Sequence, residues 1–192
     1  MNTKKYWMPT GDWPIGTGYK YAHSLMSLFG LSEGTCKSYD LLLLPGGADI
    51  GQRPQRDSME LTALEEARAE GKSIFGICRG MQLMLYASGV RLIDHIPDVT
   101  TTIEHRTLTG EWTGQSGWHR TTKGLLVNSR HHQGVIENLG HWEVVDTAED
   151  GIVEAVRTEN QYGVQWHPEH PEMNGTPALS WLESELKKYD II

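Results

Sequence analysis

Residues 73–82, SIFGICRGMQ, place a cysteine where a buried strand turns into a helix. The apolar run 73–77 predicts a strand that is buried on both faces, and residues 80–87 continue with helical spacing. Gly76 and Gly80 stand on either side of Cys78, and residues without a side chain leave room for a sharp corner. This Gly-x-Cys-x-Gly pattern is typical of a nucleophile elbow, so the stretch predicts a strand–helix unit that presents a thiol.

The same ten residues also fit a small, buried and unreactive cysteine. Against that alternative, the helix that follows directs its N-terminal N–H groups toward the sulfur, which favours the thiolate. The backbone N–H of Arg79 then faces the place where an oxyanion would form. Cys36 has no such setting, because it lies in the polar connection EGTCKSY.

A second strand–helix unit precedes this one in the chain. The four leucines 41–44, followed by Pro-Gly-Gly, predict another strand that is buried on both faces. Asp57 and Glu60 have the spacing of a capping box at the start of the next helix, and apolar residues recur along one helical face over 61–67. Two such units in succession are typical of a parallel α/β sheet, whose sites lie at the carboxyl ends of the strands.

The remaining segments complete the predicted fold. Residues 4–9 are expected to form an edge strand or the first strand, and 19–29 a helix. Further elements are expected in the C-terminal half: a strand over 124–129, a hairpin over 142–158 turning at Asp150-Gly151, a strand over 162–166 and a helix capped by Thr176 before Pro177. We therefore predict one domain over residues 1–192, in the α/β class. Its open, mostly parallel sheet is flanked by helices, with a small antiparallel element in the C-terminal half.

Composition limits the classes of protein that this chain can represent. The chain has 192 residues, 38% of them hydrophobic and 22% charged, which suits a soluble globular protein. The net charge of −8 excludes a general basic surface for nucleic acid or anionic membranes. Two cysteines make no disulfide framework, the start has no apolar core of a signal peptide, and no segment approaches the roughly 20 apolar residues of a membrane span. We expect a cytoplasmic protein with reduced thiols.

A thiol nucleophile needs a histidine base and a group that orients the histidine. His167 and Glu169 follow the apolar strand YGVQW and are separated by a proline, which ends the strand. Gly46 and Gly47 can turn a second backbone N–H toward the same pocket. Taken alone, the two glycines favour a simple turn.

Four blocks occur together in one order: LLLLPGGADI, GICRGMQ, VNSRHHQG and GVQWHPE. In this order they resemble the class I glutamine amidotransferase-like superfamily, which has a flavodoxin-like sheet. The greatest similarity is to its gamma-glutamyl hydrolase branch, the peptidase C26 type that includes gamma-glutamyl-gamma-aminobutyrate hydrolases.

The resemblance implies a catalytic triad: Cys78 as nucleophile, His167 as general base and acid, and Glu169 orienting His167. It implies an oxyanion hole made by the N–H groups of Gly47 and Arg79. The substrate-binding residues that it implies are Gln82, Ser129, Arg130, His131 and His132. The implied reaction is hydrolysis of a gamma-glutamyl amide, glutamine or a gamma-glutamyl amine, through a glutamyl thioester, with no metal or other cofactor.

Alternatives remain open at this point. The chain could be a glutaminase subunit that passes ammonia to a synthetase partner, or a binding protein without activity. Zinc could be held by the histidine pair 131–132 or by residues 167–170. A basic cluster could contact an anionic leaving group, although a solvated loop is the favoured interpretation; its members are Arg106, His119, Arg120 and Lys123. The short segment 30–40 rims the expected site, so the identity of the leaving amine stays open.

Overall fold

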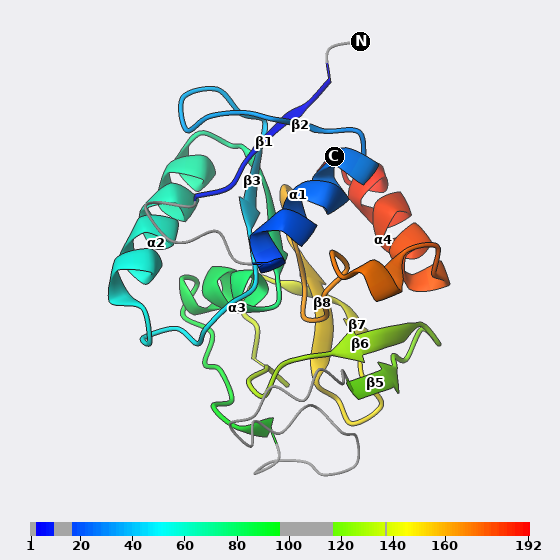
Figure 1. The fold of residues 1–192 in the computed structure, drawn as a ribbon. Helices are drawn as coiled ribbons and strands as arrows, with labels where there is room; N and C mark the ends of the chain where they lie inside the picture. Colours follow the sequence, from blue (N-terminus) through cyan, green and yellow to red (C-terminus); the bar gives the residue numbers. More distant parts are fainter. Residues whose placement is uncertain (1–2, 10–16, 97–116, 137) are drawn as a thin grey trace.

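A seven-stranded sheet forms the centre of the protein in the computed structural model, which describes residues 3–9, 17–96, 117–136 and 138–192 (Figure 1). Its strand order is β2-β1-β3-β4-β9-β8-β7. The strands are β1 (Lys5–Trp7), β2 (Ser32–Glu33), β3 (Leu41–Leu44), β4 (Ser73–Ile77), β7 (Glu143–Thr147), β8 (Val153–Arg157) and β9 (Gln161–Val164). Strands β2, β1, β3, β4 and β9 are parallel, whereas β8 and β7 run antiparallel to their neighbours. The predicted fold class is confirmed.

Helices cover both faces of this sheet. The four α-helices are α1 (Thr17–Leu28), α2 (Pro54–Ala69), α3 (Arg79–Tyr86) and α4 (Pro177–Lys188). Leu41 and Leu43 pack in the core that contains α1 and α4, and Leu42 and Leu44 in the core that contains α2 and α3. A strand between two helical layers buries both its faces, which explains the run of four leucines.

The antiparallel element in the C-terminal half is a separate two-stranded sheet. Strand β5 (Gly117–Arg120) pairs with β6 (Leu126–Ser129), and residues 97–116 before it lie outside the described residues. The predicted hairpin is formed by β7 and β8. A short 3-10 helix, η2 (Pro171–Met173), leads to α4, where the Leu179 N–H donates to the Thr176 hydroxyl at 3.2 Å, as a helix cap should.

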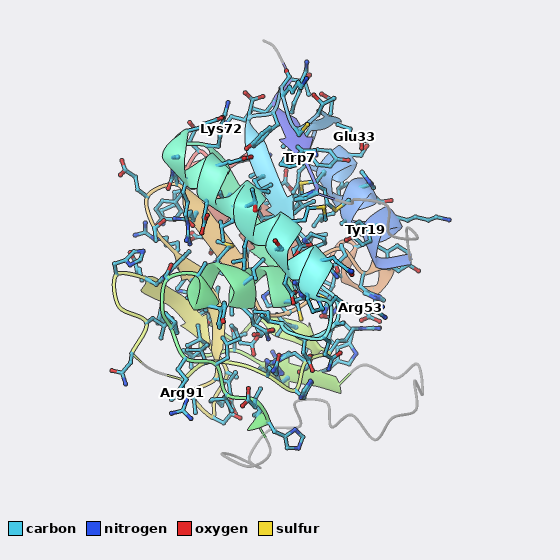
Figure 2. All side chains as sticks on the ribbon, turned by 90° about the vertical axis from the view of Figure 1, so that its left-hand side faces the viewer. Trp7, Tyr19, Glu33, Arg53, Lys72 and Arg91 are labelled. Carbon is cyan, nitrogen blue, oxygen red and sulfur yellow. The ribbon has the colours of Figure 1, made fainter. Side chains whose placement is uncertain are left out.

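The predicted first strand is β1, and the two-residue strand β2 lies outside it in the sheet. One prediction about local structure was wrong. Asp57 and Glu60 form no capping box, because α2 begins earlier, at Pro54, with Arg53 as its N-cap residue. Proline suits the first position of a helix, and the start at Pro54 carries both carboxylates into the buried part of α2. Figure 2 shows α2 across the sheet, between the labelled Arg53 at its start and Lys72 after its end.

Among the described helices, none is long and apolar enough to cross a membrane. That residues 1–192 make up one domain stays a prediction.

Candidate active site

Cys78 lies at a strained corner between β4 and α3. Its backbone has φ 50° and ψ −106°, a conformation that side-chain-bearing residues rarely adopt and that clusters at functional sites. The Cys78 N–H donates to the Val164 carbonyl at 2.7 Å, so β9 holds the corner in place. A Cβ at Gly80 would collide with the backbone of Leu44, and one at Gly76 would meet Met84 and the start of α3. The two glycines therefore supply the room that the turn requires.

His167 and Glu169 form a hydrogen-bonded pair just beyond β9. The His167 Nδ1 and Glu169 Oε1 atoms lie 2.7 Å apart, and the two side chains are 14% and 4% exposed. Burial lowers the pKa of His167, but the negative charges at Glu169 and Cys78 raise it by more, so this pKa stands well above its ordinary value. Because Nδ1 is bonded to Glu169, Nε2 is the ring nitrogen left for proton exchange.

Asn128 of β6 holds the backbone of His167 from both sides. Its Oδ1 accepts from the His167 N–H at 2.9 Å, and its Nδ2 donates to the His167 carbonyl at 3.0 Å. The same Nδ2 donates to Glu172 at 3.1 Å. The small antiparallel sheet thereby positions His167 through Asn128, a residue for which the sequence predicted no role.

The Pro-Gly-Gly turn after β3 closes the other side of Cys78. A Cβ on Gly46 would lie 2.7 Å from His167 Cε1 and 3.7 Å from the Cys78 Cβ, so the glycine stands directly beside both side chains. At Gly47, the space for a Cβ is occupied by the guanidinium of Arg56. The structure thus brings Gly46, Cys78 and His167 together.

A chain of buried amides leads to the sulfur. Gln165 Nε2 donates to Cys78 Sγ at 3.5 Å, a distance that suits a hydrogen bond to sulfur. Gln165 Oε1 accepts from Gln82 Nε2 at 3.2 Å, and Gln82 Nε2 also donates to the Gln133 carbonyl at 3.1 Å. Gln82 therefore orients Gln165, a glutamine within the GVQWHPE block for which the sequence predicted no role. That Gln82 binds substrate stays a prediction.

The predicted substrate wall, residues 129–132, lies close to this chain. Ser129 is fully buried at the end of β6, and Arg130 pairs with Glu172 at 3.3 Å. His131 Nδ1 lies 3.0 Å from the Gln133 carbonyl, while His132 Nε2 lies 3.1 Å from Asp49. The Asp49–His132 pair joins the wall to the segment that follows the glycine turn.

The described members of the predicted basic cluster do not share one surface, because the side chain of His119 is buried. Its Nε2 lies 3.2 Å from Glu154 Oε1, and His131 Nε2 lies 3.7 Å from the same oxygen. Burial lowers the pKa of His119, yet the hydrogen bond and charge of Glu154 raise it by more. Arg120 donates to the Gly124 carbonyl at 3.1 Å at the surface, and Arg106 lies outside the described residues.

The zinc interpretation finds no support in the positions of these side chains. Within the described residues, no three His, Cys, Asp or Glu side chains are grouped so that they could hold a metal ion. His131 and His132 turn to different carboxylates, Glu154 and Asp49.

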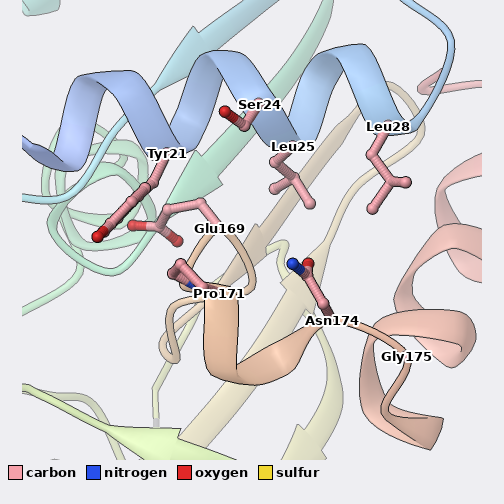
Figure 3. Close-up of a pocket in the computed structure, with 8 residues that line it drawn as sticks. All are labelled: Tyr21, Ser24, Leu25, Leu28, Glu169, Pro171, Asn174 and Gly175. Carbon is pink, nitrogen blue, oxygen red and sulfur yellow. The ribbon is translucent and has the colours of Figure 1, made fainter.

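A pocket of about 520 Å³ lies on the α1 side of Glu169 (Figure 3). The residues that line it are Tyr21, Ser24, Leu25, Leu28, Glu169, Pro171, Asn174 and Gly175. Glu169 Oε2, which does not bond His167, has no hydrogen-bond partner among the described residues. The carboxylate thus contributes both to the histidine pair and to this pocket.

The fold and the order of these elements define a class of protein: an α/β protein with the fold of the glutamine amidotransferases. A glutamine amidotransferase from Thermotoga maritima superposes on the whole chain with a TM-score of 0.64 at 15% identity, and 87% of that chain is covered. The solved structure of PurLQS from the same organism gives a TM-score of 0.66 at 17% identity, covering 98% of this chain and 99% of that one.

Within that class, the chain belongs to the Peptidase C26 family, whose model matches residues 35–169. A glutamine amidotransferase-like protein, YvdE of Lactococcus lactis, is 31% identical over 158 residues, 68% of this chain and 66% of that protein. The gamma-glutamyl-gamma-aminobutyrate hydrolase PuuD of Escherichia coli is 30% identical over 135 residues, 60% of this chain and 53% of that protein. The chain spans between half and two thirds of the length of these two relatives.

Proposed function

We propose that this protein hydrolyses a gamma-glutamyl amide bond, in glutamine or in a gamma-glutamyl amine, through a glutamyl thioester on Cys78. The observation that carries the proposal is the strained corner at Cys78 next to the hydrogen-bonded pair of His167 and Glu169. A nucleophile, a base and a group that orients the base are the parts that acyl transfer needs. The similarity to PuuD supports the choice of a gamma-glutamyl amide.

In the proposed first step, His167 Nε2 takes the thiol proton and Cys78 Sγ attacks the gamma-carbonyl carbon. The carbonyl oxygen becomes an oxyanion, which the N–H groups of Gly47 and Arg79 stabilise. The intermediate collapses to a thioester as the amine leaves with the proton held by His167. Water then attacks the thioester with His167 as base, which releases glutamate and restores the thiol.

Glu169 accepts a hydrogen bond from the Nδ1–H of His167 and stabilises the imidazolium that forms in each step. Gln165 Nε2 donates to the Cys78 sulfur and orients it. The proposed substrate-binding residues are Gln82, Ser129, Arg130, His131 and His132. These steps require no metal or organic cofactor.

The test is to trap the thioester. Enzyme mixed with glutamine or with each of several gamma-glutamyl amines is quenched in acid during the first turnovers, and its intact mass is measured. Wild type and Cys36→Ala should both carry a glutamyl group, whereas Cys78→Ala should not. Cys36 is the matched control because it is the other cysteine and is exposed. Absence of both adduct and amine release across the whole panel would reject the proposal.

The similarity to PurLQS favours a second candidate, a glutaminase subunit that delivers ammonia to a synthetase partner. The two candidates differ in what the isolated protein does. A free-standing hydrolase releases amine from at least one substrate of the panel by itself. A partner-dependent subunit is nearly silent until its synthetase is added.

A further inference from the structure

The carboxylate of Glu60 is fully buried in α2 and pairs with arginines from two different segments. Its Oε1 accepts from Arg56 Nε at 2.9 Å, and its Oε2 accepts from Arg79 Nη1. The other amino group of Arg79 donates to Asp57. Two cations and two anions make a balanced network, which a buried position requires.

Arg56 holds the glycine turn after β3. Its Nη2 donates to the Gly46 carbonyl at 3.0 Å and to the Pro45 carbonyl at 3.3 Å. Its guanidinium also fills the space beside Gly47, and the Tyr19 ring packs over it with the guanidinium carbon 5.7 Å from the ring centroid. The position of the Gly47 N–H therefore depends on where Glu60 holds Arg56.

The proposed oxyanion hole has two donors, the N–H of Gly47 on the glycine turn and the N–H of Arg79 at the start of α3. Arg79 follows Cys78 directly and is the first residue of α3, so its backbone N–H lies next to the nucleophile. Its side chain is 1% exposed and ends on Glu60 and Asp57. Asp57 in turn accepts from the Gly51 N–H at 2.8 Å, which fastens the far end of the loop that carries Gly47.

We infer that Glu60, through Arg56 and Arg79, sets the distance between the two halves of the oxyanion hole. Two N–H donors on separate segments stabilise an oxyanion only if both point at the place where the charge develops. Glu60 is bonded through one oxygen to Arg79, which carries one donor, and through the other to Arg56, which holds the turn that carries the second donor. Glu60, Arg56 and Asp57 are thus positioning residues that touch no reacting atom. The inference rests on the proposed function, since it assumes that Cys78 is acylated.

The test compares two reactions of the same thiolate in a Cys36→Ala background. With p-nitrophenyl acetate, Cys78 Sγ attacks the carbonyl, an oxyanion forms, and p-nitrophenolate leaves a thioester behind. With iodoacetamide, Sγ displaces iodide from a saturated carbon, and no oxyanion forms. Loss of a correctly placed oxyanion hole therefore slows the first reaction and leaves the second unchanged.

The test variants are Glu60→Gln and Arg56→Lys, with Arg68→Lys as the matched control. Arg68 lies on the same helix and also donates to buried groups, Gln161 and the Met84 carbonyl, but it contacts neither half of the hole. We expect acylation to fall by about 10- to 100-fold in both test variants. Alkylation should stay within about 2-fold of wild type, which would show that thiolate and fold are intact.

Three results would overturn the inference: parallel losses of acylation and alkylation, an unchanged acylation rate, or an equal loss in Arg68→Lys. Wild-type Cys78 that is alkylated but never acylated would also overturn it. If Glu60→Gln does not fold, Arg56→Lys decides, because it keeps the positive charge and loses the planar fork. Failure of the proposed function is recognised separately, as wild type that is acylated by the ester but releases no amine from any gamma-glutamyl substrate.

Discussion

The imidazole of His167 is held on Glu169 at 2.7 Å, with one proline between the two residues. Proline restricts its own φ, so the two side chains keep their relative directions without support from a regular strand. The pairing leaves the Nε2 atom for the proton transfers proposed above and raises the pKa of His167 against the effect of its burial.

This raised pKa predicts the pH dependence of the reaction. The pair of Cys78 and His167 must hold one proton, which the leaving amine receives. Because the pKa of His167 is well above 6.5, this proton is kept to higher pH, and the alkaline limb of kcat/KM should lie above that value. Glu169→Gln removes a negative charge that raises this pKa, so the limb should move to lower pH while kcat falls by about 100-fold. Glu183→Gln on α4 is the matched change, and its pH profile should be that of wild type. An alkaline limb that stays in place in Glu169→Gln would contradict the assignment.

The strain at Cys78 predicts an unusual order of stability. Positive φ costs a residue with a side chain about 1–3 kcal/mol, whereas glycine costs about 0.5–1 kcal/mol through chain entropy. Cys78→Gly should therefore be more stable than Cys78→Ala, by about 1 kcal/mol in urea unfolding, and both should be inactive. At Glu65, exposed in the middle of α2, glycine should be less stable than alanine by about 1 kcal/mol. If the alanine variant is the more stable one at position 78 as well as at position 65, the backbone of Cys78 is not strained.

The closeness of Gly46 to the histidine predicts a large effect from one methyl group. In Gly46→Ala the new Cβ would lie 2.7 Å from His167 Cε1, so the ring must move. A displacement of about 1 Å lowers activity by about 100-fold. Gly124→Ala is the control, because Gly124 has φ 77° and open space around it. Gly124→Ala should lose about 1 kcal/mol of stability and keep its activity. Full activity in Gly46→Ala would contradict the predicted displacement of the His167 ring.

The buried pair of His119 and Glu154 predicts how stability changes with pH. A histidine whose pKa is raised on folding contributes its full stability below its ordinary value of 6.5 and loses it as the pH rises through the folded value. Burial also raises the pKa of Glu154, so the variant must remove both groups: His119→Gln with Glu154→Gln. Between pH 6 and pH 9, wild type should lose stability relative to this double variant, because both raised pKa values make the folded protein hold protons that the unfolded chain releases. Urea unfolding at both pH values measures it, with His141→Gln, at an exposed histidine, as the control. Wild type that gains stability relative to the double variant toward pH 9 would contradict this account.

The sequence predicted those parts of the structure that depend on neighbours in the chain. Leu41–Leu44, the corner at Cys78 and the cap at Thr176 follow from local patterns, and the structure has them where the patterns place them. Glu60 shows the limit of this reasoning. Its spacing from Asp57 fits a capping box equally well, and the side chain of Arg79, 19 residues further on, decides that both carboxylates turn inward.

Asn128 and Gln165 show the same limit within quoted motifs. Each lies inside a block that carries the family resemblance, but its partner is distant: His167 is 39 residues from Asn128, and Cys78 is 87 residues from Gln165. A single sequence carries no signal for contacts of this range. Their place in these blocks marks both amides as candidate site residues, although it does not identify their partners.

The two hydrogen bonds between Asn128 and His167 also bear on how this scaffold can be re-engineered. The β5–β6 hairpin is outside the main sheet, but Val127 of β6 packs in the core with α1 and α4. The exposed residues of the hairpin can therefore be exchanged without rebuilding that core, whereas its buried residues cannot. Any grafted hairpin must place one side-chain amide beside the backbone of His167, where the amide accepts from the N–H and donates to the carbonyl. Libraries that vary this hairpin should therefore hold positions 127–129 constant and diversify its exposed residues.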